Sequence, residues 1–473
     1  MRDGADRQKR SPLHIAFQNG LLDISRLLVN KGASLDHVDY LGRTVMHLLS
    51  WRRGGSLPIV GSLQKWEHGI ALPFVKYLVS MSFEDFDTPD HYGETPLFNM
   101  GLIGASNVWS TLLEYGACIT GRGKIDPFGM LRSAATGGST SIITSILDSD
   151  NSINVHIPDD NRRRPLQIAA RGGHAAAVEL LLGKGAAIDA QDHFECGMTA
   201  LHIACYYGRI DVVKLLLEKG ADVNCTDNKG STALHAACQR SPVDVVKLLL
   251  EKGAYVNCTD NEGSTALHAA CWDGRIDVVE LLLERRASVN CTDDEGRTPL
   301  HACMWATMRD RGGLAPAELV LSLLSRGARV NARNILGATP LLELASIFAL
   351  YDSTRESVDV SLLDVYRCLL NNGADPHLLG WVADCVCDNA ELEFYYLDTG
   401  CLCTPADATH LRYKRDNFDA YVEALREQYN EIIVDADGDV FWDAKEEIDG
   451  EGYGCSYESK RRWQEEAGER LEW

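Results

Sequence analysis

The sequence predicts an all-α fold, and three observations carry this prediction. Residues 199–297 divide without a gap into three units of 33 residues. Each unit opens with Thr-Ala-Leu-His, continues into apolar residues at helical spacing, and closes with a nearly identical turn. A fixed period of this length is typical of a solenoid, in which each repeat buries its apolar face against its neighbours. The 473 residues can therefore form one array instead of several globular domains.

Each unit predicts two helices. Thr199 can cap the first helix, and several other units have proline directly after the capping position, where it costs no hydrogen bond. Val212 and Leu216 belong to an apolar stripe at helical spacing and predict the buried face of the second helix. Gly220 follows, where a helix often ends in the left-handed conformation.

The units resemble the ankyrin repeat, in their length and in the Thr-Ala-Leu-His motif at Thr199, Thr232 and Thr265. The resemblance implies a solenoid of helix-turn-helix units with short β-turn or hairpin tips, which binds other proteins. It covers about residues 11–380, as about ten repeats, and is strongest over 164–340. Residues 1–10 are interpreted as a polar N-terminal segment.

The outer repeats are less regular. The second repeat opens at Thr44, and the fourth, from Met130 to about residue 163, is degenerate because it lacks the histidine. We interpret the first of three insertions as a surface loop. The insertions lie near residues 52–70, 308–316 and 351–358.

Beyond residue 380 the repeat pattern fades. Residues 381–434 are expected to hold a degenerate repeat and a C-terminal helical cap, since Asn417 can cap an amphipathic helix with apolar places from Phe418 to Ile432. Residues 435–473 form an acidic tail that we expect to be partly disordered.

The charge distribution bears on the class of partner. The net charge is −22, and residues 381–473 contribute −15 of it, from 24 acidic and nine basic residues. This balance argues against a nucleic-acid-binding surface, which needs clustered lysine and arginine. No apolar run is long enough to cross a membrane, and the N-terminus lacks the apolar core of a secretory signal. The expected partners are other proteins, with no nucleic acid and no membrane, and the chain is expected to be a monomer.

The fifteen cysteines do not predict a disulfide scaffold. Cys225, Cys258 and Cys291 occupy equivalent turn sites, and stacked repeats hold such sites about 10 Å apart, too far for a bridge. Cysteines at equivalent helix sites, such as Cys205, are interpreted as small buried hydrophobic residues. A reducing intracellular compartment, the cytoplasm or the nucleus, is therefore expected.

Four histidines recur once per repeat: His202, His235, His268 and His301. Imidazoles in a row could bind metal or act as bases. A separation of about 10 Å keeps them out of one coordination sphere, because metal–nitrogen distances are near 2 Å. The ankyrin resemblance implies instead that each bonds the threonine of its own turn.

Two C-terminal stretches could bind metal. The first contains Cys385, Cys387, Cys401 and Cys403, whose C-x-C spacing departs from the C-x₂₋₄-C spacing of zinc sites. Buried thiols in a degenerate repeat are the alternative that we favour.

The second stretch, from Asp435 to Glu446, has acidic residues at several positions of a calcium-binding loop. Val440 stands where that loop needs glycine. The alternative is an acidic linear segment around residues 440–442 that docks onto a basic partner or onto the chain's own helices. We expect no metal and no cofactor.

No nucleophile motif, phosphate-binding glycine loop or catalytic carboxylate pair with supporting context is present, so the chain is expected not to be an enzyme. Protein binding is expected on the concave face and on the turn tips. On the concave face, the expected positions are the two residues that follow the pair of small residues in each first helix, such as Ala204-Cys205. Aromatic residues and arginine are enriched at binding hot spots. The alternative is that these side chains pack sideways on neighbouring repeats. The positions are Tyr206, Tyr207, Gln239, Arg240, Trp272, Asp273 and Trp305 on the helices, and Lys229, Glu262 and Glu295 on the tips.

These observations predict a non-catalytic interaction scaffold or adaptor. An alternative is a regulatory module whose acidic tail modulates binding; a zinc- or calcium-binding protein is a third hypothesis. One residue departs from the repeat: Arg286 occupies the place of Gly220 and Gly253, where a positive φ is expected.

Overall fold

The computed structural model describes residues 6–50, 63, 66–81, 83, 86–119, 127–149, 153, 155–156, 164–192, 197–306, 316–344, 360–375, 432–434 and 440–442. The chain divides into two units. The first comprises residues 1–335 and 360–374 and contains the helical repeats. The second comprises residues 336–359 and 375–473 and contains a short hairpin.

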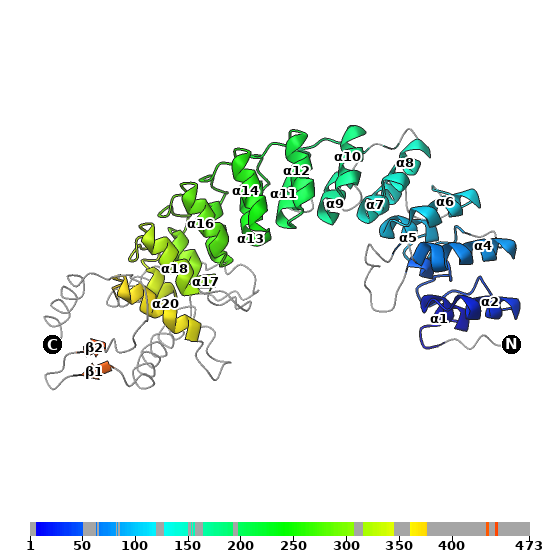
Figure 1. Cartoon of the computed structure of the whole chain (residues 1–473), viewed down its shortest axis with the longest axis horizontal. Helices are drawn as coiled ribbons and strands as arrows, with labels where there is room; N and C mark the ends of the chain where they lie inside the picture. The colour runs from blue at the N-terminus through cyan, green and yellow to red at the C-terminus, as the bar shows by residue number, and fades with distance from the viewer. Residues whose placement is uncertain are drawn as a thin grey trace, which may run out of the picture. The chain divides into compact units, whose positions relative to one another are not determined.

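The first unit is built from pairs of helices, as Figure 1 shows, so the predicted all-α solenoid is confirmed. The first helices of successive repeats pack on one another in one row. This row consists of α1 (Pro12–Gln18), η1 (His47–Ser50), α5 (Pro96–Ile103), α7 (Pro127–Gly137), α9 (Pro165–Gly172), α11 (Ala200–Tyr206), α13 (Ala233–Arg240), α15 (Ala266–Trp272) and α17 (Pro299–Ala306).

The second helices form another row, in which consecutive members from α4 onward pack on each other. The apolar stripes predicted from the sequence face inward, and Val212, Val213 and Leu216 are fully buried. This row consists of α2 (Leu22–Asn30), α4 (Leu72–Ser80), α6 (Ser106–Glu114), α8 (Thr140–Ser149), α10 (Ala175–Gly183), α12 (Ile210–Glu218), α14 (Val243–Glu251), α16 (Ile276–Glu284), α18 (Pro316–Ser325) and α20 (Val360–Asn371).

The capping threonines begin the first helices as predicted. In α11, Thr199 and His202 form a reciprocal capping box, and the same arrangement recurs at α13 and α15. The threonine hydroxyl satisfies a helix N–H that has no partner within the helix. Elsewhere proline takes the first helical position, as at Pro165 of α9.

The turns between repeats are held by aspartate and asparagine. Asp227 Oδ1 accepts hydrogen bonds from the backbone N–H groups of Lys229 (2.8 Å) and Ser231 (2.9 Å), which fixes the turn. Thr226 and Thr232 then form an isolated antiparallel bridge, which makes the tip a minimal hairpin. Asn224 joins this turn to the next repeat, because its side chain accepts from Tyr255 N–H and donates to the carbonyl of Gly253.

The first insertion is not a loop throughout, which corrects the prediction at its C-terminal end. Residues Glu67–Ala71 form a π-helix, η2, that continues directly into α4. Glu67 is buried, and its carboxylate accepts from Asn107 Nδ2 (2.9 Å), Asn107 N–H (3.1 Å) and Val108 N–H (3.5 Å). It therefore caps the N-terminus of α6, where a negative charge is favoured.

Two other boundaries differ from the prediction. The fourth repeat begins its first helix at Pro127, three residues before Met130, because proline again takes the helix start. The second repeat has only the 3₁₀ turn His47–Ser50 as its first helix, directly before the insertion.

The second unit contains β1 (Ile432–Val434) and β2 (Val440–Trp442), which pair antiparallel. Ile432 was expected at the end of the capping helix and is instead in a strand, because β-branched and aromatic residues fill both segments. A calcium-binding loop would follow a helix, and β1 stands where that helix would be. The rest of the expected C-terminal cap, the acidic tail apart from β2 and the four C-x-C cysteines lie outside the described residues.

Candidate functional site

Six side chains at the C-terminal ends of five successive first helices, α9 to α17, form two groups of contacts along the array. We call these six side chains the aromatic strip. It contains five of the seven helix positions predicted from the sequence, together with Arg171, which the prediction left out. Its members are Arg171, Tyr206, Tyr207, Arg240, Trp272 and Trp305.

In one half of the strip, two guanidinium groups flank a pair of phenol rings. The Arg171 guanidinium carbon lies 5.0 Å from the ring centroid of Tyr207, and that of Arg240 lies 5.4 Å from the centroid of Tyr206. The two tyrosine rings meet edge to face at 5.2 Å. The two guanidinium distances are within the range of a cation–π contact, and the ring–ring distance is within the range of an aromatic pair. The four side chains thus link α9, α11 and α13.

The other half of the strip is a pair of indoles. The ring centroids of Trp272 on α15 and Trp305 on α17 are 5.2 Å apart, and their planes differ by 22°. Both side chains are half-buried. Stacked aromatic pairs of this kind stabilise by about 0.5–1.5 kcal/mol beyond the area they bury.

These contacts bear on the two alternatives that the sequence left open. The side chains do reach sideways onto neighbouring repeats, because each of the three pairs between repeats joins residues about 33 positions apart. They also keep solvent contact, since Tyr207, Gln239 and Arg240 are exposed. The strip is thus partly preorganised by its own neighbours and still accessible. Asp273, the remaining predicted helix position, is half-buried.

The predicted turn-tip residues are separate from the strip. Lys229, Glu262 and Glu295 are exposed on their turns, at the opposite end of each first helix from the aromatic residue. A helix of seven residues is about 10 Å long, which sets this separation. The Glu295 carboxylate already pairs with Arg297 at 2.7 Å.

The histidine ladder is structural, as the resemblance implied. Thr232 Oγ1 lies 2.8 Å from His235 Nδ1, and the Thr199–His202 pair has the same distance. Because His235 Nδ1 accepts from the backbone N–H of Thr232, the proton is on Nε2, which donates to the carbonyl of Ser264. Burial lowers the pKa of His202, His235 and His268, so these rings are neutral at pH 7.

The cysteines of the described residues are free thiols. Those on the first helices, such as Cys205 and Cys238, are fully buried, and burial raises the pKa of each well above its usual range. Such thiols remain protonated and are poor nucleophiles. No three His, Cys, Asp or Glu side chains in the described part of the chain are placed to share a metal ion. No helix among the described residues is long and apolar enough to span a membrane.

Arg171 was not among the predicted positions, because the prediction rested on the aromatic residues of the later repeats. The signal was nevertheless present: Arg171 occupies the position equivalent to Tyr206 in the preceding repeat, and side chains at equivalent positions of adjacent repeats are neighbours.

Comparison with family models agrees with the helix pairs. A model described as ankyrin repeats in three copies matches residues 131–227, 184–260, 219–293 and 256–334. A single ankyrin repeat model matches residues 8–40. No curated protein matches the chain.

Proposed function

This chain belongs to the ankyrin repeat family, and we propose that it is a non-catalytic scaffold or adaptor that binds a partner protein on the aromatic strip. Ankyrin repeats are typically protein-binding modules, and the matched models contain no catalytic domain. The identity of the binding residues is our inference from the geometry.

The observation that carries the proposal is the combination of aromatic identity with accessibility. A repeat needs no large aromatic residue at this position, since Gln239 occupies it in α13. Tyr206, Tyr207, Trp272 and Trp305 are nevertheless aromatic, and contacts between repeats hold their rings in two groups. Tyrosine and tryptophan have few rotatable bonds and lose little conformational entropy on binding, and both are enriched with arginine at binding hot spots.

The test is capture of a partner by the full chain from its native cell, followed by the same capture with Tyr207→Ala and Trp272→Ala. Loss of the partner with an unchanged melting temperature supports the proposal. Capture at the wild-type level by both variants contradicts it. The turn tips Lys229 and Glu262 are secondary positions in the same proposal.

A second candidate function is regulation of this surface by the acidic tail. Arg171 and Arg240 give the strip positive charge, whereas residues 381–473 carry −15. Opposite charges of this size favour association at low salt. Residues 435–473 would then compete with the partner for the strip.

The cytoplasm or the nucleus is the compartment that we propose, with the chain as a monomer. Nine cysteines of the described residues are free, including the partly exposed turn thiols Cys225, Cys258 and Cys291. A reducing environment keeps thiols in this state.

A further inference from the structure

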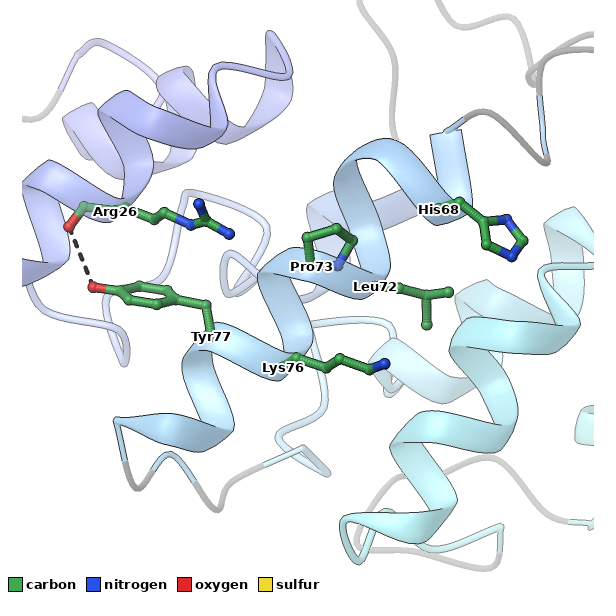
Figure 2. A pocket seen from close by; sticks show the side chains of 6 residues that line it. All are labelled: Arg26, His68, Leu72, Pro73, Lys76 and Tyr77. Atoms are coloured by element: carbon green, nitrogen blue, oxygen red, sulfur yellow. Dashed lines mark hydrogen bonds between the residues drawn. The ribbon is translucent and has the colours of Figure 1, made fainter.

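A second surface feature lies far along the chain from the aromatic strip. It is an open pocket of about 530 Å³ between α2 and the continuous η2–α4 helix. Its lining consists of Arg26, His68, Leu72, Pro73, Lys76 and Tyr77 (Figure 2). Figure 2 shows Arg26 and Tyr77 at one end of the row and His68 at the other.

The lining is unusual for this protein because it contains three nitrogen-bearing side chains and no carboxylate. The chain as a whole has 68 acidic and 46 basic residues, so a lining without an acidic group departs from its average surface. The π-helix produces this grouping. Because η2 runs into α4 without a break, His68, Leu72 and Lys76 fall on one face at intervals of four residues.

Contacts with Tyr77 fix the position of Arg26, but one hydrogen-bond donor of its guanidinium has no acceptor among the described residues. Its guanidinium carbon lies 5.6 Å from the ring centroid of Tyr77, and the Tyr77 hydroxyl bonds Asn30 Oδ1 at 2.8 Å and the Arg26 carbonyl at 3.3 Å. Arg26 Nε is buried, yet it has no hydrogen-bond partner among the residues that the structure describes. A buried donor without an acceptor costs about 1–3 kcal/mol, and bound ions are one of the groups that satisfy such donors.

Asp23, the acidic residue that pairs with Arg26 within the described residues, does not neutralise the pocket. Asp23 Oδ1 lies 4.0 Å from Arg26 Nη1, and the Asp23 side chain is 99% exposed. An exposed pair at this distance contributes little. Lys76 is exposed and makes no ion pair with any residue in the described ranges.

We propose that this pocket binds a phosphorylated side chain of a partner protein. Arginine presents two parallel N–H donors to a phosphate, and lysine adds a point charge. A phosphate offers three acceptor oxygens where a carboxylate offers two, and it carries nearly twice the charge, so it gains more from the Arg26 guanidinium and from the positive charge of Lys76. Leu72 and Pro73 provide an apolar floor for the adjacent peptide.

A protein ligand is favoured over a membrane lipid. The net charge of −22 opposes approach to an anionic membrane surface. The inference therefore rests on the proposed protein-binding function for the class of ligand, but it uses a different site.

The test uses the full chain and a randomised phosphoserine, phosphothreonine and phosphotyrosine peptide array, with the same peptides unphosphorylated. Peptides selected on the array are then titrated against the wild type, Arg26→Gln and Lys76→Gln. Each substitution should weaken binding about tenfold or more, because each removes a charge-assisted contact. The matched control is Lys214→Gln, an exposed lysine on α12, which should bind like the wild type.

Lys76 is exposed, so its variant remains informative even if Arg26→Gln alters folding through the lost contact with Tyr77. Equal binding of phosphorylated and unphosphorylated peptides would overturn the proposal. So would an equal loss with Lys214→Gln, or binding only to phosphatidylinositol-phosphate vesicles. Trp272→Ala should leave phosphopeptide affinity unchanged, which separates failure of this pocket from failure of the aromatic strip.

Discussion

His235 Nε2 lies 3.1 Å from the carbonyl oxygen of Ser264, the last residue of the same 33-residue unit, directly before the capping Thr265 of the next. The same bond joins His202 to Ser231 (2.9 Å) and His268 to Arg297 (3.0 Å). The sequence indicated only the bond within each turn. The second ring nitrogen ties the first helix to the residue directly before the next capping threonine, so the neutral imidazole helps to fix where the next repeat begins.

This arrangement predicts that the array loses stability in mild acid. Burial is the main cause that lowers the pKa of His14, His47, His202, His235 and His268. In the unfolded chain histidine titrates near pH 6.5, so below about that pH the unfolded state binds more protons than the folded state. The contribution of these buried, neutral histidines to the free energy of unfolding is fully present above about pH 6.5 and decreases as the pH falls. The melting temperature should therefore be lower at about pH 5 than at about pH 7.5.

His235→Gln provides the control for this prediction. The equivalent residue of α9 is Gln167, whose Nε2 donates to the carbonyl of Ala190 at 2.7 Å, so glutamine can make a bond of this kind without titrating. The variant should show a smaller loss of melting temperature in acid than the wild type. An identical pH profile would mean that His235 does not contribute to the acid sensitivity.

Replacing Arg286 with glycine should stabilise the protein. Arg286 has φ +65°, in the left-handed region, and the equivalent Gly253 has φ +91°. A residue with a Cβ costs about 1 kcal/mol or more in this conformation. Arg286→Gly should therefore raise the free energy of unfolding by about 1 kcal/mol in chemical denaturation.

The reciprocal variant isolates the backbone effect. A Cβ at Gly253 would meet no atom within 4 Å, so Gly253→Arg changes the local conformational preference without a steric clash. It should lower stability by a similar amount. An unchanged or lower free energy of unfolding for Arg286→Gly would contradict this explanation.

The aromatic strip should contribute to partner binding more than to folding. Tyr207→Ala and Trp272→Ala should each reduce partner affinity about tenfold or more, as expected for hot-spot residues. Tyr255 is a suitable control, because it is 67% exposed and lies outside the strip. Tyr255→Ala should bind like the wild type in surface plasmon resonance. A comparable loss with the control would indicate a general effect of removing aromatic residues.

Glu67 should be needed for stability, although it lies within a segment predicted as a loop. Glu67→Ala removes the acceptor for two backbone N–H groups of α6 and should destabilise the protein by about 1–3 kcal/mol. Glu114→Ala, at the exposed C-terminal end of the same helix, should change stability by less than about 0.5 kcal/mol. Urea denaturation of the two variants compares them directly.

Deletion of residues 435–473 tests the regulatory hypothesis. If the acidic tail competes for the strip, the shortened chain should bind the partner more tightly at low salt, and the difference should shrink at about 0.5 M salt. Affinity that is the same with and without the tail at low salt would remove this hypothesis.

The repeat period and the capping motif were enough to predict the helices of the array. The Thr199–His202 turn and the left-handed Gly220 needed only local information, because capping and chain reversal depend on residues a few positions apart. The helix boundaries that differ from the prediction lie where proline or an insertion interrupts the repeat period, as at Pro127 and Glu67.

The candidate sites required more than the sequence. The residues of the strip could be named from repeat geometry, but the Arg171–Tyr207 contact depends on side-chain direction. The pocket at Arg26 could not be predicted, because the segment that supplies His68 has no repeat pattern and folds as a π-helix. Its function depends on the approach of α2 to α4, elements separated by an insertion.

The stacked pair of Trp272 and Trp305 also gives the array an intrinsic optical probe. Indoles with centroids 5.2 Å apart couple their electronic transitions, and this coupling depends on the distance and angle between the rings. Because the two residues belong to adjacent repeats, a near-ultraviolet circular dichroism band from this pair would report the separation of α15 from α17 without any added label. The C-terminal part of the array can thus be followed as it opens under denaturant, independently of the repeats before it.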